Sequence, residues 1–361
     1  MSTSAGPAGP AGHTGSAGAA PGALMAAEIA EQPDVLARVL DATDVAPLAE
    51  AVRRRPPRFV LFAARGTSDH AALYGKYLVE IILGLPAGLA SPSTMTVYGT
   101  RPDLRDVLLI AISQSGESPD LVRTAEVARE CGASVLGITN APASALAETA
   151  DHHLDVRAGP ELAIAATKSY TAELLATYLL VDAIRGGTGA AAREVPDQVA
   201  ALVERRDEVA ALSQRDRFAD RIVTTARGYS YPTAREAALK LMETSYLAAA
   251  AYSAADLMHG PLAMLDRDHP VLAVVPDGRA VDAIRPVLER LRERGSDLTT
   301  FGGESCAALA HASFVHDAPL AEEAAPIVGI VPLQLLALEM ALTRGEDPDR
   351  PRGLSKSTRT W

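Results

Sequence analysis

Residues 58–68 read RFVLFAARGTS, and residues 221–230 read RIVTTARGYS. Each stretch is a short apolar run, typical of a buried strand, that ends in Ala-Arg-Gly-X-Ser and continues into a helical pattern. Because the same signal occurs twice, the sequence predicts one folding unit in two copies.

Further apolar runs follow each copy in the same order. A second strand is expected over 107–112 and 270–275, and a third over 134–139 and 297–301. Short apolar runs that alternate with helical segments predict an α/β fold, with a parallel sheet flanked by helices in each half. We predict a disordered tail at 1–22, a first domain at 23–195, a second domain at 196–345 and a C-terminal tail or lid at 346–361.

Composition excludes several classes of function. The chain has 361 residues and a formal net charge of −11, which argues against a nucleic-acid partner, because affinity for the phosphate backbone comes from clustered Lys and Arg. Cys131 and Cys306 lie far apart, and no pair of histidines has the spacing of metal ligands on a helix, so we expect no metal and no cofactor.

The same survey bears on location. No apolar run approaches the ~20 residues that cross a bilayer, and residues 1–22 lack the basic start and apolar core of a signal peptide. We therefore expect a cytoplasmic protein without a membrane partner.

The second strand of the first copy ends in a polar turn. Residues 108–120 read LLIAISQSGESPD, and an amphipathic segment follows over 121–131. The hydroxyls thus stand at a helix N-terminus, where unpaired N–H groups and the helix dipole favour an anion. Gly116 allows the backbone to approach a ligand closely. One serine would indicate an ordinary capped loop. Three serines, a glutamine and a glycine within six positions favour a phosphate site.

The second copy differs at this turn. It reads Pro276-Asp277-Gly278, which supplies fewer donors and adds a negative charge. We therefore expect one phosphate site per chain, in the first domain, and the second domain is free to supply chemistry.

A helical segment over 231–246 carries Glu236, Lys240 and Glu243 along one face. Such spacing is common in ion-pair ladders on solvated surfaces. Here the segment begins at the carboxyl end of a strand, where ligands bind in open sheets. A carboxylate beside a lysine at that edge is a candidate general base.

Two other segments contain candidate catalytic groups. His259 precedes a Gly-Pro break and is either structural or a proton-transfer group. The basic stretch 349–361 is either a frayed tail or a lid that brings Lys356 to a substrate carbonyl.

Together these segments resemble the sugar isomerase (SIS) family, in particular the isomerase half of glucosamine-6-phosphate synthase and its free-standing, deaminase-like relatives. The resemblance runs from about Leu24 to Lys356. Its motifs are the Gly-Thr-Ser turn, the serine turn, Ala-Thr-Lys at 166–168, Glu-X-X-X-Lys-X-X-Glu at 236–243, His-Gly-Pro-Leu at 259–262 and Pro-Arg-X-Leu-X-Lys-Ser at 351–357. It implies two tandem SIS domains, each a three-layer α/β/α unit.

The resemblance also implies roles for individual residues. Those expected to bind the sugar 6-phosphate are Ser113, Gln114, Ser115 and Ser118, and those expected to line the sugar are Ser68, Ile164 and Ala166. Glu243 corresponds to the base that moves a proton between carbons 2 and 1, and Lys240 to its electrostatic partner. His259 corresponds to the residue that opens the sugar ring and is supplied by the neighbouring subunit of a homodimer. Lys356 corresponds to the tail lysine that forms an imine with an open-chain ketose.

The implied reaction is the isomerisation and deamination of glucosamine 6-phosphate to fructose 6-phosphate. A close alternative is dehydration of N-acetylglucosamine 6-phosphate through the same carbanion, and a non-catalytic sugar-phosphate sensor ranks lower. The chain contains no glutaminase domain, so a complete synthase is not expected. Ala166 replaces a family serine and Gly353 replaces an asparagine, which leaves details of sugar contact open. The configuration at carbon 4 stays open as well.

Overall fold

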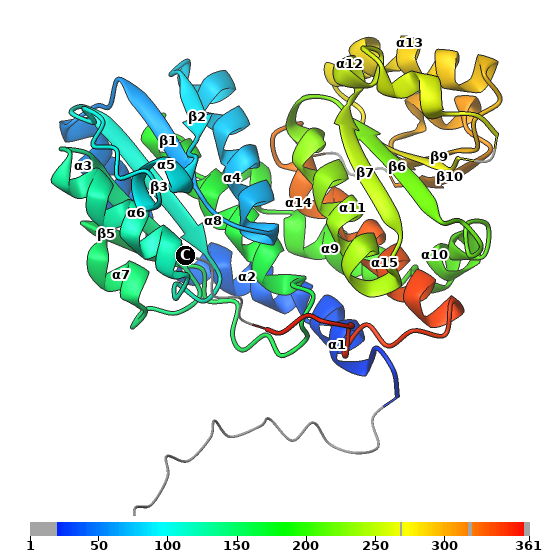
Figure 1. The fold of residues 1–361 in the computed structure, drawn as a ribbon, viewed down its shortest axis with the longest axis horizontal. Coiled ribbons are helices and arrows are strands. Elements are labelled where there is room, and N and C mark those ends of the chain that lie inside the picture. Colours follow the sequence, from blue (N-terminus) through cyan, green and yellow to red (C-terminus); the bar gives the residue numbers. More distant parts are fainter. Residues whose placement is uncertain (1–19, 268, 317–319, 357–361) are drawn as a thin grey trace, which may run out of the picture.

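The computed structural model describes residues 20–267, 269–316 and 320–356 and contains two lobes, each built on a parallel sheet (Figure 1). Residues 1–19 of the expected tail and the last five residues of the chain lie outside the described residues. The two-domain α/β expectation is confirmed.

Each sheet has five strands in the same order. The first sheet runs β2-β1-β3-β4-β5 and the second runs β7-β6-β8-β9-β10, and every pair is parallel. The strands of the first sheet are β1 (Phe59–Ala63), β2 (Ala87–Leu89), β3 (Val107–Ser113), β4 (Ser134–Thr139) and β5 (His152–Asp155). Those of the second are β6 (Arg221–Ala226), β7 (Ala248–Ser253), β8 (Val271–Val275), β9 (Leu298–Gly302) and β10 (Ala312–Val315).

The register of the two sheets matches as well. Leu61 pairs with Leu109 in the first sheet, and the residues 162 positions later, Val223 and Val271, pair in the second. The repeat predicted from two Arg-Gly turns is therefore a structural duplication. Adding 162 to a residue number in the first lobe therefore gives the equivalent residue in the central strands of the second lobe.

Helices cover both sheets and join the lobes. In the first half they are α1 (Ala23–Ala30), α2 (Gln32–Ala42), α3 (Ala46–Arg54), α4 (Thr67–Leu78), the π-helical turn η1 (Val79–Leu83), α5 (Pro92–Thr96), α6 (Pro119–Glu130), α7 (Ala145–Thr149) and α8 (Lys168–Ile184). In the second half they are η2 (Ala190–Ala192), α9 (Val195–Val203), α10 (Arg206–Ser213), η3 (Gly228–Ser230), α11 (Tyr231–Ser245), α12 (Ala254–Leu257), η4 (Pro261–Met264), α13 (Ala280–Glu293), η5 (Glu304–Leu309), α14 (Ala325–Gly329) and α15 (Val331–Thr343).

The helices between the sheets pack into one shared core. Helix α4 contacts α8 and α11, and α11 contacts α15. A single cluster of buried apolar side chains includes Tyr74 of α4, Leu241 of α11 and Leu336 of α15. The shared core therefore joins the two lobes and packs α11 of the second lobe against α4 of the first.

The helical stretch 325–343 corrects one expectation. It is long and apolar enough to cross a membrane, although no such run was expected from the sequence, and 83% of it is buried inside the protein. Pro326 and Pro332 occupy the first turns of α14 and α15, where a missing N–H is tolerated. The stretch is therefore a core helix pair of the second lobe.

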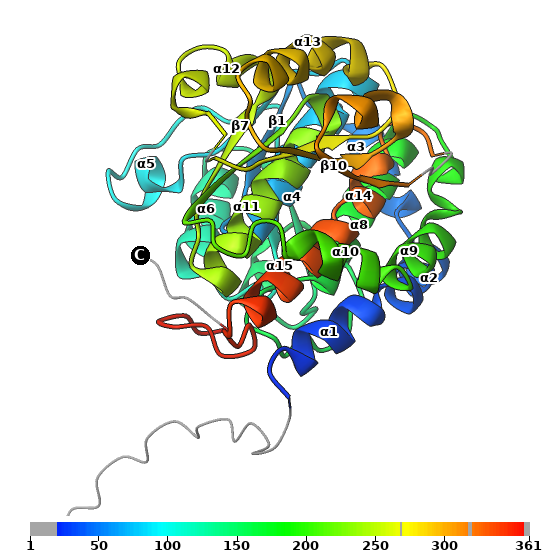
Figure 2. The ribbon, with the colours of Figure 1, turned by 90° about the vertical axis from the view of Figure 1, so that its right-hand side faces the viewer.

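The segment after α15 folds back onto the start of α1. The carboxylates of Asp347 and Asp349 accept hydrogen bonds from the backbone N–H groups of Gly22, Leu24 and Met25, at 2.8–3.1 Å. Figure 2 shows this segment beside the first turn of α1. Acidic side chains at a helix N-terminus satisfy its free N–H groups and its dipole, so α1 holds the root of the C-terminal tail.

Candidate active site

The serine turn lies between β3 and α6, as the sequence predicts. Ser113 Oγ accepts the N–H of Gly116 at 3.1 Å, and Ser115 Oγ accepts the N–H of Glu117 at 3.3 Å. Gly116 has a φ of 65°, and a Cβ there would collide with Ser144. Only glycine adopts this left-handed conformation without strain in so little space, so the turn depends on Gly116.

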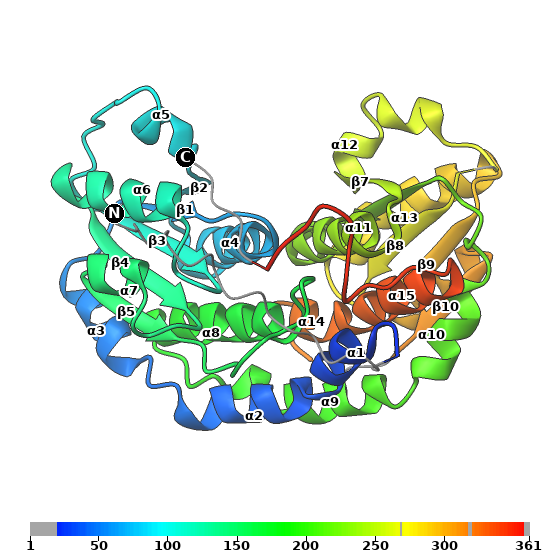
Figure 3. The same cartoon turned by 60° about the horizontal axis from the view of Figure 1, so that its bottom comes forward.

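A cleft of about 810 Å³ opens over this turn. Every residue expected at the site lines it except Lys240 and His259, and the expected residues that do are Ser68, Ser113, Gln114, Ser115, Ser118, Ile164, Ala166, Glu243 and Lys356. Its walls come from the carboxyl edge of the first sheet, the loop before α8, helix α11 and the C-terminal tail. Figure 3 shows that tail, in red, passing α11 and reaching the first lobe.

Helix α11 brings a buried charge cluster to the wall of this cleft. Lys240 Nζ lies 2.6 Å from Glu243 Oε2 and 3.3 Å from Glu236 Oε1, and it donates to Thr67 Oγ1 at 2.9 Å. His70 Nδ1 of α4 lies 2.7 Å from the other oxygen of Glu236. The cluster joins α4 to α11, and Glu243 is its member that lines the cleft.

Opposite charges hold Lys240 and Glu236 in their ionised forms. Burial by itself lowers the pKa of Lys240, but the carboxylates of Glu236 and Glu243 outweigh it and raise that pKa above its usual value. For Glu236, burial raises the pKa, and Lys240 and His70 more than offset it, so the net pKa is lowered. Lys240 therefore stays an ammonium beside Glu243.

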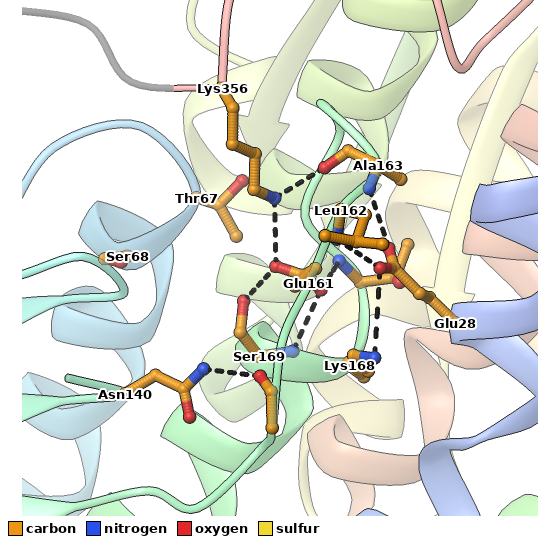
Figure 4. Close-up of polar contacts among 12 residues, drawn as sticks. Glu28, Thr67, Ser68, Asn140, Glu161, Leu162, Ala163, Lys168, Ser169 and Lys356 are labelled. Carbon is orange, nitrogen blue, oxygen red and sulfur yellow. Dashed lines mark hydrogen bonds and ion pairs between the residues drawn. The ribbon is translucent and has the colours of Figure 1, made fainter. Parts of the chain in front are cut away.

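A second buried carboxylate organises the loop before α8. Glu161 accepts the backbone N–H groups of Thr167 at 2.8 Å and Ser169 at 3.1 Å, together with the Ser169 hydroxyl. Lys356 Nζ lies 3.4 Å from Glu161 and donates to the carbonyl of Ala163 (Figure 4). Glu161 thus fixes the loop and also receives the tail lysine.

Glu28 of α1 holds the same loop from its outer side. Its carboxylate accepts the N–H groups of Leu162 and Ala163 (Figure 4). Burial raises the pKa of Glu28, partly offset by the Leu162 bond. The ammonium of Lys168 stands 3.8 Å away. Ile164 and Ala166 reach the cleft because both ends of their loop are bonded in this way.

Ser68, at the start of α4, is bonded to another buried carboxyl group, that of Glu173. Its hydroxyl donates to Glu173 Oε1 at 2.9 Å. Burial raises the pKa of Glu173 to about 8, and the charges of Glu161 and Glu236 add to this against the Ser68 bond. Glu173 is therefore protonated at neutral pH and lies behind the cleft as a neutral acid.

The structure leaves two expected residues outside the cleft. Lys240 lies behind Glu243 and contacts it directly, so its expected electrostatic role does not require a place on the cleft wall. His259 is exposed in the segment between α12 and η4 and does not line the cleft. Its expected contribution from a neighbouring subunit remains a prediction.

Sequence reasoning missed Thr67, His70, Glu161 and Glu173. His70, Glu161 and Glu173 lie in helical or loop segments where such residues are common, and their spacing does not indicate a site. Ser68 and Thr67 belong to one Gly-Thr-Ser turn, so Thr67 was the residue with a usable signal. The partners of Glu161 and Glu173 come from distant segments, which only the fold brings together.

The chain is similar in sequence to a known protein family and to characterised enzymes. The SIS domain model matches residues 55–183 and 217–344. Glutamine–fructose-6-phosphate aminotransferase (isomerizing) of Acidithiobacillus ferridurans is 35% identical over 356 residues, which cover 92% of this chain. The chain spans 58% of the length of that relative.

Two solved structures are similar throughout the described fold. A chain from Silicibacter pomeroyi, proposed to be a phosphosugar isomerase, has a TM-score of 0.81 and 32% identity, and the match covers 90% of this chain and 99% of that one. The C-terminal domain of glucosamine-fructose-6-phosphate aminotransferase from Francisella tularensis has a TM-score of 0.81 and 28% identity, with 90% and 97% covered.

Proposed function

This chain belongs to the SIS domain family, and from that premise we propose that it is an enzyme that isomerises and deaminates glucosamine 6-phosphate to fructose 6-phosphate. One observation carries the proposal. A single cleft is lined by a hydroxyl-rich turn at a helix N-terminus and by the carboxylate of Glu243, which is paired with a buried lysine. The first feature suits a phosphate and the second suits proton transfer.

The serine turn anchors the substrate in this proposal. Ser113, Gln114, Ser115 and Ser118 surround the phosphate at the start of α6, whose dipole favours a negative charge. With the phosphate fixed, carbons 1 and 2 of the open-chain sugar extend toward α11. Holding the reacting carbons beside a base removes much of the entropy cost of the step.

Glu243 then removes the proton from carbon 2, which the neighbouring aldehyde carbonyl acidifies. The electron pair forms the carbon 1–carbon 2 double bond, the former carbonyl oxygen takes a proton from water, and the product is an enolamine. The same carboxyl group returns its proton to carbon 1 while the electron pair on nitrogen forms the carbon 2–nitrogen double bond. The resulting iminium releases one N–H proton to water and leaves the imine. Water adds to that imine and expels ammonia, which leaves fructose 6-phosphate. The ammonium of Lys240, 2.6 Å from Glu243, holds the base in position.

The position of Lys356 bears on its expected role. Lys356 itself lines the cleft, and its ammonium is bonded to Glu161 and to the Ala163 carbonyl, which do not. An imine with a ketose requires a neutral amine, so the lysine has to leave this pair before it attacks a carbonyl. With Lys356 bonded in this way, the C-terminal tail closes one side of the cleft.

A second candidate reaction is dehydration of N-acetylglucosamine 6-phosphate. Acetylation prevents the imine from forming, and the carbanion at carbon 2 can instead expel the hydroxyl on carbon 3. The observation that favours it is Ala166, which lines the cleft with a methyl group where the resemblance expects a serine hydroxymethyl group. The smaller side chain leaves more room beside the sugar.

Product analysis by NMR tests the proposal. The purified chain is incubated separately with glucosamine 6-phosphate and with its N-acetyl derivative. Fructose 6-phosphate and ammonia from the first substrate are the expected products. An unsaturated sugar from the second substrate alone would instead establish the dehydratase, and binding without turnover of either would establish a sensor. The galactosamine derivatives, run in parallel, determine the configuration accepted at carbon 4.

A further inference from the structure

A second cavity, of about 660 Å³, lies at the carboxyl edge of the second sheet. It is lined by Arg227 and Gly228 after β6, by Arg279 and Ala280 at the start of α13, and by Arg185 at the end of α8. Ile81 and Ile82 of η1 and the segment 321–323 complete its walls. The cavity therefore receives residues from both lobes, as the serine-lined cleft does.

This cavity is the duplicated counterpart of the cleft. The register of the two sheets relates residues 162 positions apart. By that offset, Arg227-Gly228 corresponds to Arg65-Gly66, which line the cleft, and Arg279-Ala280 corresponds to Glu117-Ser118 of the serine turn. Duplication has placed two cavities at equivalent edges, each facing a helix of the opposite lobe.

The equivalent positions carry different chemistry. The residue 162 positions before Glu243 is Ile81, which lines the second cavity. The position equivalent to Lys240 is Leu78, which is completely buried. The second cavity therefore has an apolar side chain where the cleft has its candidate base. Proton transfer from a bound ligand has no acceptor at this position.

The hydroxyls of the serine turn are also replaced. Val275, Asp277 and Ala280 stand at the positions of Ser113, Ser115 and Ser118, and Arg279 stands at the position of Glu117. Within the described ranges, the side chains of Arg227 and Arg279 have no ion-pair partner and both are exposed. Arg185 contributes a third guanidinium, which lies 2.6 Å from Asp182 and 3.6 Å from Glu323. Positive charge thus takes the place of the hydroxyl donors.

Two carboxylates of the protein, Glu322 and Glu323, also line the cavity, and Glu323 lies 3.6 Å from Arg185. The carboxylate of Glu322 accepts the backbone N–H of Arg279 at 3.1 Å and that of Ala280 at 3.0 Å. The negative charge of Asp277 was expected to disfavour a phosphate at this turn. Its carboxylate instead bonds to Ser305 and does not line the cavity. Asp277 therefore does not repel an anion in this cavity, and the negative charge at this turn is that of Glu322.

We propose that this arginine-lined cavity is a second binding site, which holds a small organic phosphate without converting it. Arg227 and Arg279 bind the phosphate group, since guanidinium groups form strong charge-assisted pairs with phosphate oxygens. Ile81 and Ile82 cover the apolar side of the ligand. Glu322 competes with the ligand for the same end of the cavity. This site goes beyond the proposed reaction and revises the expectation of one phosphate site per chain.

The test counts bound ligand by equilibrium dialysis of the full chain with sorbitol 6-phosphate. This probe carries a phosphate monoester but no carbonyl, so the cleft cannot turn it over. The wild-type chain is expected to bind two molecules and the double variant Arg227→Gln/Arg279→Gln one. Ser115→Ala/Ser118→Ala, which weakens the cleft instead, should leave the arginine-dependent molecule bound. Glu322→Gln should tighten the second site several-fold, because a competing charge is removed.

The matched control is Arg290→Gln/Arg292→Gln, which removes two arginines of the same helix α13 that do not line the cavity. It should still bind two molecules, with affinities within about twofold of wild type. One bound molecule or none in the wild-type chain would overturn the proposal. Equal losses in the two arginine variants would also overturn it, because they would reduce the effect to net charge. Urea denaturation of each variant establishes that it is folded.

Discussion

Glu243 differs from the buried acidic residues behind the cleft in its access to solvent. Its side chain is 22% exposed, whereas those of Glu236 and Glu161 are completely buried. Glu173 is 1% exposed and bonded to Ser68. Of these four carboxyl groups, Glu243 is the one that reaches the cleft, and the other three position its surroundings.

The pKa of Glu173 predicts a dependence of stability on pH. A carboxyl group whose pKa is about 8 in the folded chain and near 4.5 in the unfolded chain binds more protons when folded, between those two values. Stability should therefore fall as pH rises through that window. Between pH 6.5 and 8 the wild-type chain should lose about 2 kcal/mol more than Glu173→Gln, which has no proton to release.

Urea denaturation at several pH values measures this difference. Asp216 has a pKa raised by burial to about 6, so its contribution falls mostly below the chosen range and is shared by both chains. Parallel stability curves for wild type and Glu173→Gln would contradict the assignment of a neutral Glu173.

Some residues of the cleft could be predicted from the sequence and others could not. Ser113, Ser115, Ser118 and Glu243 were expected at the site and line one cleft, because they follow strands or lie on a helix that starts at a strand's carboxyl end. Glu161 and Glu173 were not expected. Their importance comes from burial and from partners in distant segments, and neither property is encoded in local spacing.

At the scale of elements, the β3–turn–α6 unit determines the phosphate end of the site. Gly116 is held at a φ of 65° against Ser144. Gly116→Ala should lower the free energy of unfolding by about 2–4 kcal/mol, from left-handed strain and from the collision with Ser144. It should also weaken sugar-phosphate binding at least about tenfold, because the turn has to shift.

Gly99 provides the matched control for this substitution. It has a φ of 64°, and a Cβ there would meet no atom within 4 Å. Gly99→Ala should therefore cost only the backbone strain, about 1 kcal/mol, and leave binding unchanged. Calorimetric melting and phosphate-monoester titration of both variants measure the contrast. Equal effects of the two substitutions would refute the proposed role of the turn.

The sequence predicted the three inner strands of each sheet, and it placed helices α6 and α11 within about two residues of their observed bounds. Short apolar runs and turn residues are local signals, which is why these elements could be predicted. The helical stretch 325–343 was not anticipated as one apolar segment. Its prolines and glycine suggested interruption, but they occupy helix starts and the junction of α14 with α15, where the shared core accepts them. Packing against the rest of the core, rather than a local sequence signal, therefore makes 325–343 helical.

At the scale of the whole molecule, the two lobes contribute different parts of one cleft, and His259 lies outside it. We predict that the active unit is a dimer in which His259 reaches the cleft of its partner. Mixing refolded Glu243→Gln and His259→Ala chains tests this. In a mixed dimer one cleft then combines an intact Glu243 with an intact His259.

The mixture should recover about a quarter of wild-type activity, since half of the dimers are mixed and half of their clefts are intact. Each variant alone should remain inactive. If His259 acts within its own chain, mixing restores nothing, and an active monomer at high dilution would exclude the dimeric site altogether.

We propose Glu243 as the base of a sugar-phosphate enzyme, and the turnover of glucosamine 6-phosphate by Glu243→Gln, measured together with its binding affinity, tests this role. The rate of Glu243→Gln should be reduced by about 10²–10⁴-fold, and its dissociation constant for the sugar phosphate should stay within a few-fold of wild type. Wild-type turnover by Glu243→Gln, or no turnover by the wild-type chain itself, would contradict it.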